Sequence, residues 1–278
     1  MEVFTKSELI AIHNKLLVIF KDFHDFCVSN NLKYYMIGGT MLGALRHKGF
    51  IPWDDDIDVG MPREDYEKFL TLTKEISDNC VVEYPNETNK DYKYLYAKIF
   101  DKTTTLVENT RYPLKRGLFI DIFPIDGVGN DKEKAKKHYK KISKLIALES
   151  MIVCAYRKGR KWYKNLAILL GRIISPLFIS ERKINKSFDK LAKKYSYQDS
   201  KYVGNLAGNW GIKEMMPKSY LGKPTLYDFE GFQFYGVEDA DKYLSSVYGN
   251  YMKLPLVEKR VTHHDYIEFD LNKSYLEE

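Results

Sequence analysis

The sequence predicts a mixed α/β fold of the α+β type, with a mixed sheet flanked by helices and a helical second half. Two observations predict this class. Short apolar runs typical of strands concentrate before residue 130, whereas helical periodicity dominates from residue 131 to about residue 195. With 44% hydrophobic and 29% charged residues over 278 positions, the chain can bury a substantial core.

The first predicted element is an amphipathic helix over residues 6–29. Thr5 and Glu8 have the spacing of a capping box, in which the two residues satisfy each other's backbone N–H groups at the start of a helix. Apolar residues then recur at helical intervals, at Leu9, Ile12, Leu16, Ile19, Phe20, Phe23 and Cys27.

A short strand and a short helix follow this helix. Residues 34–37 form an apolar run that reads as a strand, and the glycine pair Gly38 and Gly39 interrupts it. Thr40 is of a residue type that caps helices, so we expect it to cap a helix ending near His47.

The next stretch is "GFIPWDDDIDV", residues 49–59, which carries Asp54, Asp55, Asp56 and Asp58. Like charges this close repel one another, and something must offset that cost. Water on an exposed turn, hydrogen bonds at a helix start and a bound metal ion are the alternatives. For Asp54 and Asp55, a solvated loop or a cap suffices.

Asp56 and Asp58 alternate with apolar residues. This period of two predicts a strand over residues 56–61 with both carboxylates on one face. Pro62 follows and is expected to open a helix, because proline is favoured in the first turn.

Further strands are predicted at residues 80–84, 94–100, 104–108 and 117–125. The last of these, "GLFIDIFPI", contains Asp121 as a lone charge among apolar residues. Burying an unpaired carboxylate is costly, so Asp121 needs a bound cation or a lysine. Lys98, in a neighbouring predicted strand, is the alternative partner.

The second half is predicted from periodicity and turn residues. Helices are expected at residues 131–153 and 164–195, a hairpin at 225–237, a short helix that Gly249 stops, and a surface loop at 254–271. Residues 165–179 are strongly apolar but too short to span a bilayer, so we expect a buried helix, with an in-plane membrane helix as the alternative.

Charge is distributed unevenly along the chain. Residues 132–172 carry 13 lysines and arginines against two acids, a net charge of +11. The whole chain is only +6, so the remainder is −5. This region is either a solvated helical surface or a platform for an anionic membrane or polymer. Nothing in the pattern indicates nucleic acid.

The three cysteines lie far apart and lack metal-ligand spacing. A sparse, odd number of cysteines fits a reducing compartment, and the N-terminus has no signal-peptide pattern. We therefore expect a cytoplasmic protein, with possible peripheral contact at the inner face of the membrane.

The order of the acidic and glycine motifs suggests phosphate chemistry. A strand ends at the Gly38–Gly39 turn, Asp56 and Asp58 follow on one strand face, and Asp121 lies on a later strand. Glycines and a helix N-terminus accommodate phosphate, and three carboxylates form the oxygen site that Mg²⁺ or Mn²⁺ prefers. A simple bend remains the alternative for the glycine pair and an exposed acidic turn for Asp56 and Asp58, whereas a buried Asp121 needs a partner.

Taken in order, the motifs resemble one family. The blocks "YYMIGGTMLGALRHKGFIPWDDDIDVGMPREDYEKF", "GLFIDIFPID" and "YLSSVYGNYMKLP" followed by "EKRVTHH" are similar to the LicD family of phosphocholine transferases, distantly related to the fukutin-related transferases. The resemblance covers about residues 30–130 and 240–265. It implies a nucleotidyltransferase-like catalytic core at residues 1–130, a basic helical region at 131–200, and a C-terminal segment at 201–278 that packs back on the core.

The resemblance also implies the reaction and the cofactor. A divalent cation, Mg²⁺ or Mn²⁺, would assist transfer of phosphocholine from CDP-choline to a sugar hydroxyl of a teichoic-acid-like or other glycan, or of its lipid-linked precursor. Asp56, Asp58 and Asp121 would hold the metal, and Asp121 is alternatively the base that accepts the proton of the hydroxyl.

Other residues would contact the donor. By the same resemblance, Gly38, Gly39 and Thr40 would cradle the diphosphate, Lys98 would join them in donor binding, and Arg46 would stabilise charge on the transferred group.

The C-terminal histidines and several aromatic residues complete the candidate site. Near the C-terminus, Arg260, His263 and His264 lie in a predicted loop, and the histidines are candidates for a base or for a phosphate contact. Choline is a quaternary ammonium that binds aromatic faces. The candidates for that contact are Tyr34, Tyr35, Trp53, Tyr94 and Tyr96.

The sequence leaves three alternative functions open. The donor could supply phosphoglycerol, phosphoribitol or phosphoethanolamine in place of phosphocholine. The enzyme could instead transfer the nucleotidyl group itself. The protein could also be a non-catalytic binder of polyanions or membranes, in which the acidic cluster is a solvated turn or a calcium site.

Overall fold

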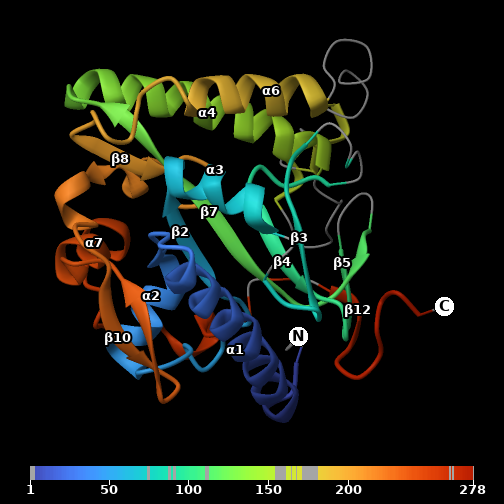
Figure 1. Ribbon diagram of the computed structural model, residues 1–278. Coiled ribbons are helices and arrows are strands. Elements are labelled where there is room, and N and C mark those ends of the chain that lie inside the picture. Colours follow the sequence, from blue (N-terminus) through green and yellow to red (C-terminus); the bar gives the residue numbers. More distant parts are fainter. Residues whose placement is uncertain are drawn as a thin grey trace.

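The computed structural model describes residues 4–73, 76–86, 89, 92–109, 113–153, 161–163, 165–166, 168–170, 181–262, 264 and 266–277. In this part of the chain a large mixed sheet of nine strands lies between helices (Figure 1). The predicted α/β class is confirmed.

The N-terminal helix matches its prediction. Helix α1 spans Lys6–Ser29, and the capping box is formed because the Thr5 side chain accepts from Glu8 N–H while the Glu8 side chain accepts from Thr5 N–H. The apolar stripe of α1 is buried in the main core. Satisfied caps of this kind contribute about 0.5–2 kcal/mol to helix stability.

The strand before the glycine pair is shorter than expected, and the helix begins earlier than expected, at the glycine pair itself. Strand β1 covers Tyr35–Met36, and helix α2 runs from Gly38 to His47, so it already includes both glycines. The prediction that Thr40 caps this helix is wrong. Ile37 is the N-cap residue without a side-chain cap, and the Thr40 hydroxyl instead accepts a hydrogen bond from Asp58 N–H at 2.8 Å.

The middle of the sheet is built by three strands. Strand β2 (Asp58–Pro62) pairs in parallel with β7 (Phe119–Gly129), which pairs antiparallel with β4 (Ala97–Asp101). Strand β3 (Cys80–Glu83) completes that side. The strands predicted near these positions are confirmed with shifted ends.

Two details around β2 differ from the sequence prediction. Asp56 precedes the strand, because β2 begins only at Asp58, so the two carboxylates do not belong to one regular strand. Pro62 is the last residue of β2 and the N-cap of helix α3 (Arg63–Leu72), one position before the expected first turn.

A smaller sheet overturns the prediction for the C-terminal segment. Residues 254–271 were expected to form a surface loop, but they include strand β12 (Tyr266–Asp270). This strand pairs with β5 (Thr105–Glu108), which also pairs with β6 (Lys115–Arg116). Because β12 finds its partner about 160 residues earlier in the chain, no local pattern could indicate it.

The remaining elements surround the main sheet. They are helices α4 (Lys132–Val153), α6 (Glu181–Ala192) and α7 (Ala240–Tyr248), strands β8 (Tyr202–Asn205), β9 (Met216–Pro217), β10 (Thr225–Phe229) and β11 (Phe232–Gly236), and the 3₁₀ turns η2 (Gly211–Glu214), η3 (Lys218–Tyr220) and η4 (Val257–Lys259). The predicted hairpin and the stop at Gly249 are confirmed. Strand β11 pairs with β1, which ties the C-terminal segment into the main sheet.

Helices α4 and α6 lie side by side against one end of β7 (Figure 1). Their apolar faces form a second core around Tyr139, Ile142 and Phe188. The expected helix over residues 164–195 falls partly outside the described residues. Of the apolar stretch 165–179, Ile168 is buried, whereas Leu169 and Leu170 are exposed.

None of the helices in the described part of the chain has the length and apolar content of a membrane span.

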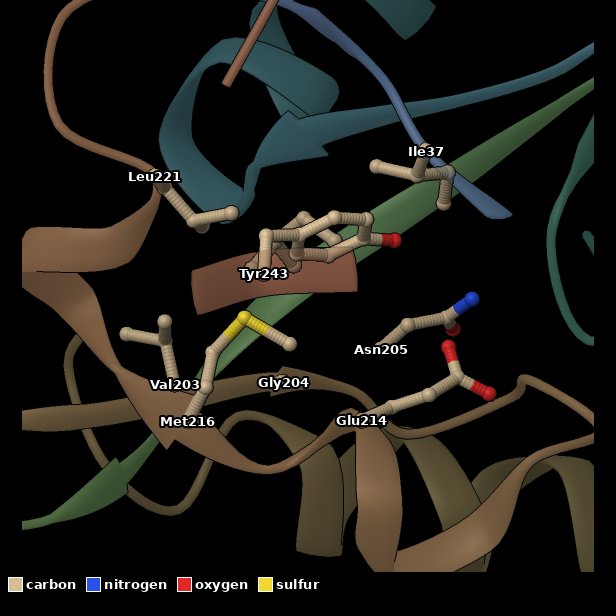
Figure 2. A pocket seen from close by; sticks show the side chains of 9 residues that line it. Ile37, Val203, Gly204, Asn205, Glu214, Met216, Leu221 and Tyr243 are labelled. Carbon is tan, nitrogen blue, oxygen red and sulfur yellow. The ribbon is translucent and has the colours of Figure 1, made fainter. Parts of the chain in front are cut away.

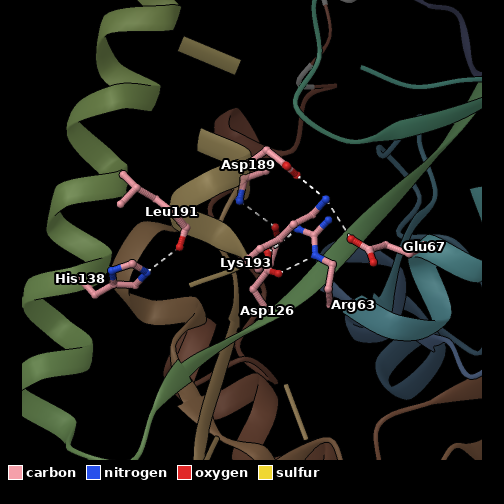
Figure 3. A network of polar contacts seen from close by, with 9 residues as sticks. Arg63, Glu67, Asp126, His138, Asp189, Leu191 and Lys193 are labelled. Atoms are coloured by element: carbon pink, nitrogen blue, oxygen red, sulfur yellow. Dashed lines mark hydrogen bonds and ion pairs between the residues drawn. The ribbon is translucent and has the colours of Figure 1, made fainter. Parts of the chain in front are cut away.

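A buried ion pair joins the two cores. Arg63 donates two parallel hydrogen bonds of 2.7 Å to Asp126, whose side chain is 1% exposed (Figure 3). Nearby, Lys193 bridges Glu67 on α3 and Asp189 on α6. Burial raises the pKa of Asp126, but the charge and hydrogen bonds of Arg63 oppose that shift.

Replacing Arg63 by methionine should lower the free energy of unfolding by about 3–5 kcal/mol, because it leaves the Asp126 carboxylate buried without its cation. Chemical denaturation measures this. The matched control is Lys21→Met, which breaks an ion pair to Asp25 whose side chains are 47% and 67% exposed and should change stability by less than about 1 kcal/mol. Equal effects of the two substitutions would contradict the structural role of Arg63.

Candidate active site

Strand pairing places three charged residues of distant sequence in one row. Asp58 on β2 lies opposite Asp121 on β7, and Asp121 lies opposite Lys98 on β4. Register partners on adjacent strands project from the same face of a sheet. The row Asp58–Asp121–Lys98 therefore forms the floor of the candidate site.

Asp121 is held by two neighbours. Lys98 Nζ lies 2.8 Å from Asp121 Oδ1, with side chains only 1% and 6% exposed, and the Tyr96 hydroxyl donates to Asp121 Oδ2 at 3.2 Å. The lysine that the sequence offered as the partner of Asp121 does contact it.

The two glycines let the start of α2 approach the acidic residues closely. Gly38 has a φ of +54°, which favours glycine, and a Cβ there would lie 3.0 Å from Asp58 Oδ2. A Cβ on Gly39 would lie 2.6 Å from Asp54 Oδ2, closer than side chains tolerate. The N-terminus of α2, a site that favours anions, therefore lies directly against Asp54 and Asp58.

Tyr243 connects this helix start to a small, mainly apolar pocket (Figure 2). The Gly38 N–H donates to the Tyr243 hydroxyl at 2.9 Å. Gly39 and Thr40 carry the next N–H groups of the first turn, and these are the ones that could meet a phosphate. In the same pocket, burial raises the pKa of Glu214 to about 7.

The acidic loop is anchored by two histidines. The His13 Nε2 atom is hydrogen-bonded to the Asp54 carbonyl at 2.7 Å. Asp55 is buried, and its Oδ1 lies 3.2 Å from His264 Nδ1, while Asp56 Oδ2 lies 3.9 Å from His264 Nε2. Burial disfavours charge on His264, but the hydrogen bond that it donates to Asp55 and the charge of Asp56 raise its pKa to about 10. This histidine is therefore a cation at neutral pH.

The carboxylates are crowded. Burial and the charges of neighbouring carboxylates raise the pKa values of Asp54, Asp56 and Asp58, and Asp121 contributes to the shift at Asp56 and Asp58. Five acids share this region with Lys98 and His264 as the nearby cations. The acids outnumber these cations, so the region keeps an excess of negative charge. A bound divalent cation would reduce that excess and would therefore stabilise the folded protein.

The fit of these residues to a metal ion rests on their chemistry. Within the described residues, no three histidine, cysteine or acidic side chains already converge as a finished metal site. The donors are nevertheless oxygen atoms, the type that Mg²⁺ prefers, and Asp55 Oδ2 is buried without a hydrogen-bond partner. Asp56, Asp58 and Asp121 would hold the ion.

A basic and aromatic cluster lies beside the acidic loop. Arg46 donates to His47 Nε2 at 2.9 Å and to the Tyr251 carbonyl at 2.8 Å. The Arg260 guanidinium lies 5.4 Å from the centre of the Trp53 ring. The structure thus brings Arg46 and Arg260 to the same side of the acidic loop, where an anionic substrate would find positive charge.

Not all of the remaining predicted residues lie at the site. Tyr34 and Tyr35 are buried core residues, and their hydroxyls bond to His24 and to the Gly222 carbonyl, so they cannot line a ligand site. His263 lies outside the described residues. Sequence reasoning missed His13 and Tyr243, because an isolated histidine or tyrosine on a helix carries no local signal.

Comparison with known proteins places the chain in one group. Residues 31–152 match the family described as LicD/FKTN/FKRP, nucleotidyltransferase domain. The chain is 33% identical over 245 residues to the lipopolysaccharide cholinephosphotransferase LicD of Haemophilus influenzae, which covers 87% of this chain and 90% of that protein. This chain belongs to the LicD family. It is therefore an enzyme of the transferase class, as its motifs predict.

Other relatives of this LicD-family chain are matched over shorter stretches. An uncharacterized protein of Rickettsia typhi is 34% identical over 135 residues, which cover 41% of this chain and 43% of that protein. The human ribitol 5-phosphate transferase FKRP is 50% identical over 34 residues, which cover 12% of this chain and 7% of that protein. The similarity to FKRP is thus confined to one short stretch of each chain.

Replacing Asp58 by asparagine should abolish the rise in melting temperature that Mg²⁺ causes and should lower transferase activity by at least about 100-fold. Without metal, the same change should not lower the free energy of unfolding, because it removes one of several repelling carboxylates. By contrast, Asp121→Asn should destabilise the protein, since it deprives buried Lys98 of its partner.

The control is Asp228→Asn on the exposed β10 strand, which should leave both the metal response and activity unchanged. If Asp58→Asn keeps the metal-induced stabilisation, Asp58 does not bind the ion.

Proposed function

We propose that this protein is a metal-dependent phosphocholine transferase that uses CDP-choline and releases CMP. The acceptor is a sugar hydroxyl of a cell-surface glycan precursor, either a teichoic-acid-like polymer or a lipopolysaccharide. The observation that carries the proposal is the 33% identity, over nearly the whole of both chains, to a lipopolysaccharide cholinephosphotransferase.

The arrangement of the site supports this chemistry. Asp56, Asp58 and Asp121 would hold Mg²⁺ or Mn²⁺, which neutralises a diphosphate and stabilises the departing CMP. The start of α2 offers the N–H groups of Gly39 and Thr40 to phosphate oxygens.

Four cationic side chains lie at the site: two orient individual aspartates, and the other two lie beside the acidic loop. Lys98 fixes Asp121, and His264 fixes Asp55. Arg46 and Arg260 supply positive charge beside the acidic loop.

The bond changes follow from this placement. The acceptor oxygen attacks the phosphorus that carries choline, the bond from that phosphorus to the bridging oxygen breaks, and CMP leaves with that oxygen. The hydroxyl proton passes to a base, a role that Asp121, next to Asp58 in the carboxylate row, would take only in the alternative in which Asp56 and Asp58 hold the ion without it.

With Mg²⁺ and a glycan acceptor, CDP-choline should give free CMP and a choline-bearing product, whereas CDP-glycerol and CDP-ribitol should react at least about 10-fold more slowly. Chromatography of the nucleotide and mass spectrometry of the acceptor make this measurement. Removal of the metal with a chelator should stop CMP release in every case.

A faster reaction with CDP-ribitol or CDP-glycerol would assign another phospho-substituent to the same fold. A product that retains CMP would instead indicate nucleotidyl transfer. Release of no CMP from any of these donors would reject the proposed function.

A lipid-linked acceptor is supported by the surface next to the site. In the segment after α7, five large apolar side chains are 44–74% exposed, namely Met252, Leu254, Leu256, Val257 and Val261. Three cations, Lys253, Lys259 and Arg260, and one acid, Glu258, interrupt this run, and Arg260 also contacts Trp53 of the acidic loop. Apolar side chains interspersed with cations suit an anionic lipid surface, which would bring the acceptor to the site at the inner face of the membrane.

The basic face of α4 is a second candidate for the same contact. Lys132, Lys134, Lys137, Lys140, Lys141 and Lys144 are exposed on it. Both surfaces would be consistent with a cytoplasmic enzyme that binds the membrane peripherally.

Vesicles distinguish the two surfaces. The double variant Leu256→Glu/Val257→Glu should lose binding to vesicles that contain anionic phosphatidylglycerol, because it inserts charge into the apolar run, while Lys140→Gln/Lys144→Gln should weaken binding only slightly. Sedimentation with vesicles at low and high salt measures this. If the wild-type protein does not sediment with anionic vesicles at low salt, the membrane contact is rejected.

A further inference from the structure

Two arginines beside the acidic loop form no ion pair with an acid in the part of the chain that the structure describes. Arg46 lies in the last turn of α2, and Arg260 directly follows the 3₁₀ turn η4. Both donate to uncharged acceptors. Burial and the charge of Arg260 lower the pKa of Arg46, so the two cations repel each other. A bound anion would offset this repulsion.

Both guanidinium groups keep N–H groups for a ligand. A guanidinium has five N–H donors and binds phosphate through two of them in parallel. Arg46 uses Nε for His47 and Nη1 for the Tyr251 carbonyl, which leaves Nη2. Among the described residues, Arg260 donates only from Nε, to the Pro255 carbonyl at 3.0 Å. Its Nη1 and Nη2 atoms are therefore open to an anion.

The Trp53 ring brings these donors into one cluster. The Arg260 guanidinium lies 5.4 Å from the ring centre of Trp53, and the His47 ring centre lies 6.1 Å from it. Burial and Arg46 lower the pKa of His47, so this ring is neutral. Because its Nε2 accepts from Arg46, its proton lies on Nδ1, which is a further donor. Arg46, His47, Trp53 and Arg260, here called the basic cluster, are all half-buried, so solvent reaches them.

The basic cluster is separate from the place proposed for the donor diphosphate. That place is the start of α2, whereas Arg46 comes eight residues after Gly38 in the same helix. At a rise of 1.5 Å per residue, the two positions are about 12 Å apart along the helix axis. The hydrogen bonds to His47 and Tyr251 hold the Arg46 guanidinium at its own end of α2. The cluster therefore fits a phosphate that does not belong to the donor.

The apolar run after α7 leads into the basic cluster. Leu256 and Val257, 62% and 74% exposed, precede Arg260 by four and three residues. A lipid-linked glycan carries a phosphate where the lipid joins the sugar. With the lipid against the apolar run, this phosphate would lie at Arg260.

We propose that the basic cluster binds the phosphate group that joins the acceptor glycan to its lipid. This inference rests on the proposed function and adds the residues that select the acceptor. Arg260 would hold the phosphate through Nη1 and Nη2, with Arg46 Nη2 and His47 Nδ1 as further donors. Trp53 directly precedes the acidic residues, so a glycan attached to this phosphate begins beside the carboxylates.

Calorimetry with small phosphates tests the cluster without turnover. Farnesyl phosphate, below the concentration at which it forms micelles, and glycerol phosphate are titrated into protein saturated with Mg²⁺ and CMP. Farnesyl phosphate should bind more tightly than glycerol phosphate. Arg260→Gln should weaken its binding by about 10-fold, because hydrogen bonds between charged groups are lost. Arg260→Lys should restore only part of the affinity, since lysine keeps the charge but lacks the planar fork.

The matched control is Lys223→Gln, which removes one positive charge from an exposed lysine outside the cluster. It should bind farnesyl phosphate as the wild type does. Melting temperatures establish that the variants fold.

Kinetics distinguish the acceptor from the donor. With a lipid-linked acceptor, Arg260→Gln should raise KM for the acceptor by about 10-fold and leave KM for CDP-choline unchanged. With an uncharged oligosaccharide that ends in the same sugar, Arg260→Gln and the wild type should have equal KM values, because this acceptor has no phosphate for the cluster to bind.

The outcomes separate this inference from the proposed function. If the wild type releases CMP but Arg260→Gln raises KM for CDP-choline, or leaves farnesyl phosphate binding unchanged, the acceptor site is wrong and the transferase function stands. If glycerol phosphate binds as tightly as farnesyl phosphate, the lipid linkage is not the source of the phosphate. If the wild type releases no CMP from CDP-choline, the proposed function is wrong, and this inference, which rests on it, falls with it.

Discussion

The parallel pairing of β2 with β7 is the interaction on which the site depends. It aligns Asp58 with Asp121, although 63 sequence positions separate them, and the antiparallel pairing of β4 adds Lys98 to the same row. A shift of one residue in either pairing would turn one of these side chains to the opposite face. The buried apolar residues between them on β2 and β7 oppose such a shift, so the core of the sheet also fixes the chemistry.

The candidate site lowers the stability of the folded protein. Buried carboxylates crowd one another, which raises the pKa values of Asp54, Asp56 and Asp58, and a helix N-terminus held against them only partly offsets the repulsion. The surrounding structure supports this arrangement through contacts that involve no substrate. The capped α1 carries His13 to the acidic loop, α7 carries Tyr243 to Gly38, and β12 brings His264 to Asp55.

Much of the fold could be predicted from local patterns. The capping box of Thr5 and Glu8, the hairpin around Glu230 and Gly231, and the stop at Gly249 depend on neighbours within a few residues, and all are present. The prediction for Thr40 was wrong because its hydroxyl bonds to Asp58 N–H, 18 positions away, in place of its own helix. Strand β12 was missed because its hydrogen-bonding partner is β5.

By itself, the sequence determined the family of the chain and the candidate side chains for its chemistry, namely the glycine pair, the acidic run and the lone Asp121. Only the tertiary structure decided how they meet. It paired Asp121 with Lys98, placed Tyr94 and Phe119 around the same ammonium, and buried Tyr34 and Tyr35 in the core. The physical reason is that residue type and spacing act along the chain, whereas strand register and packing join residues that are distant in it.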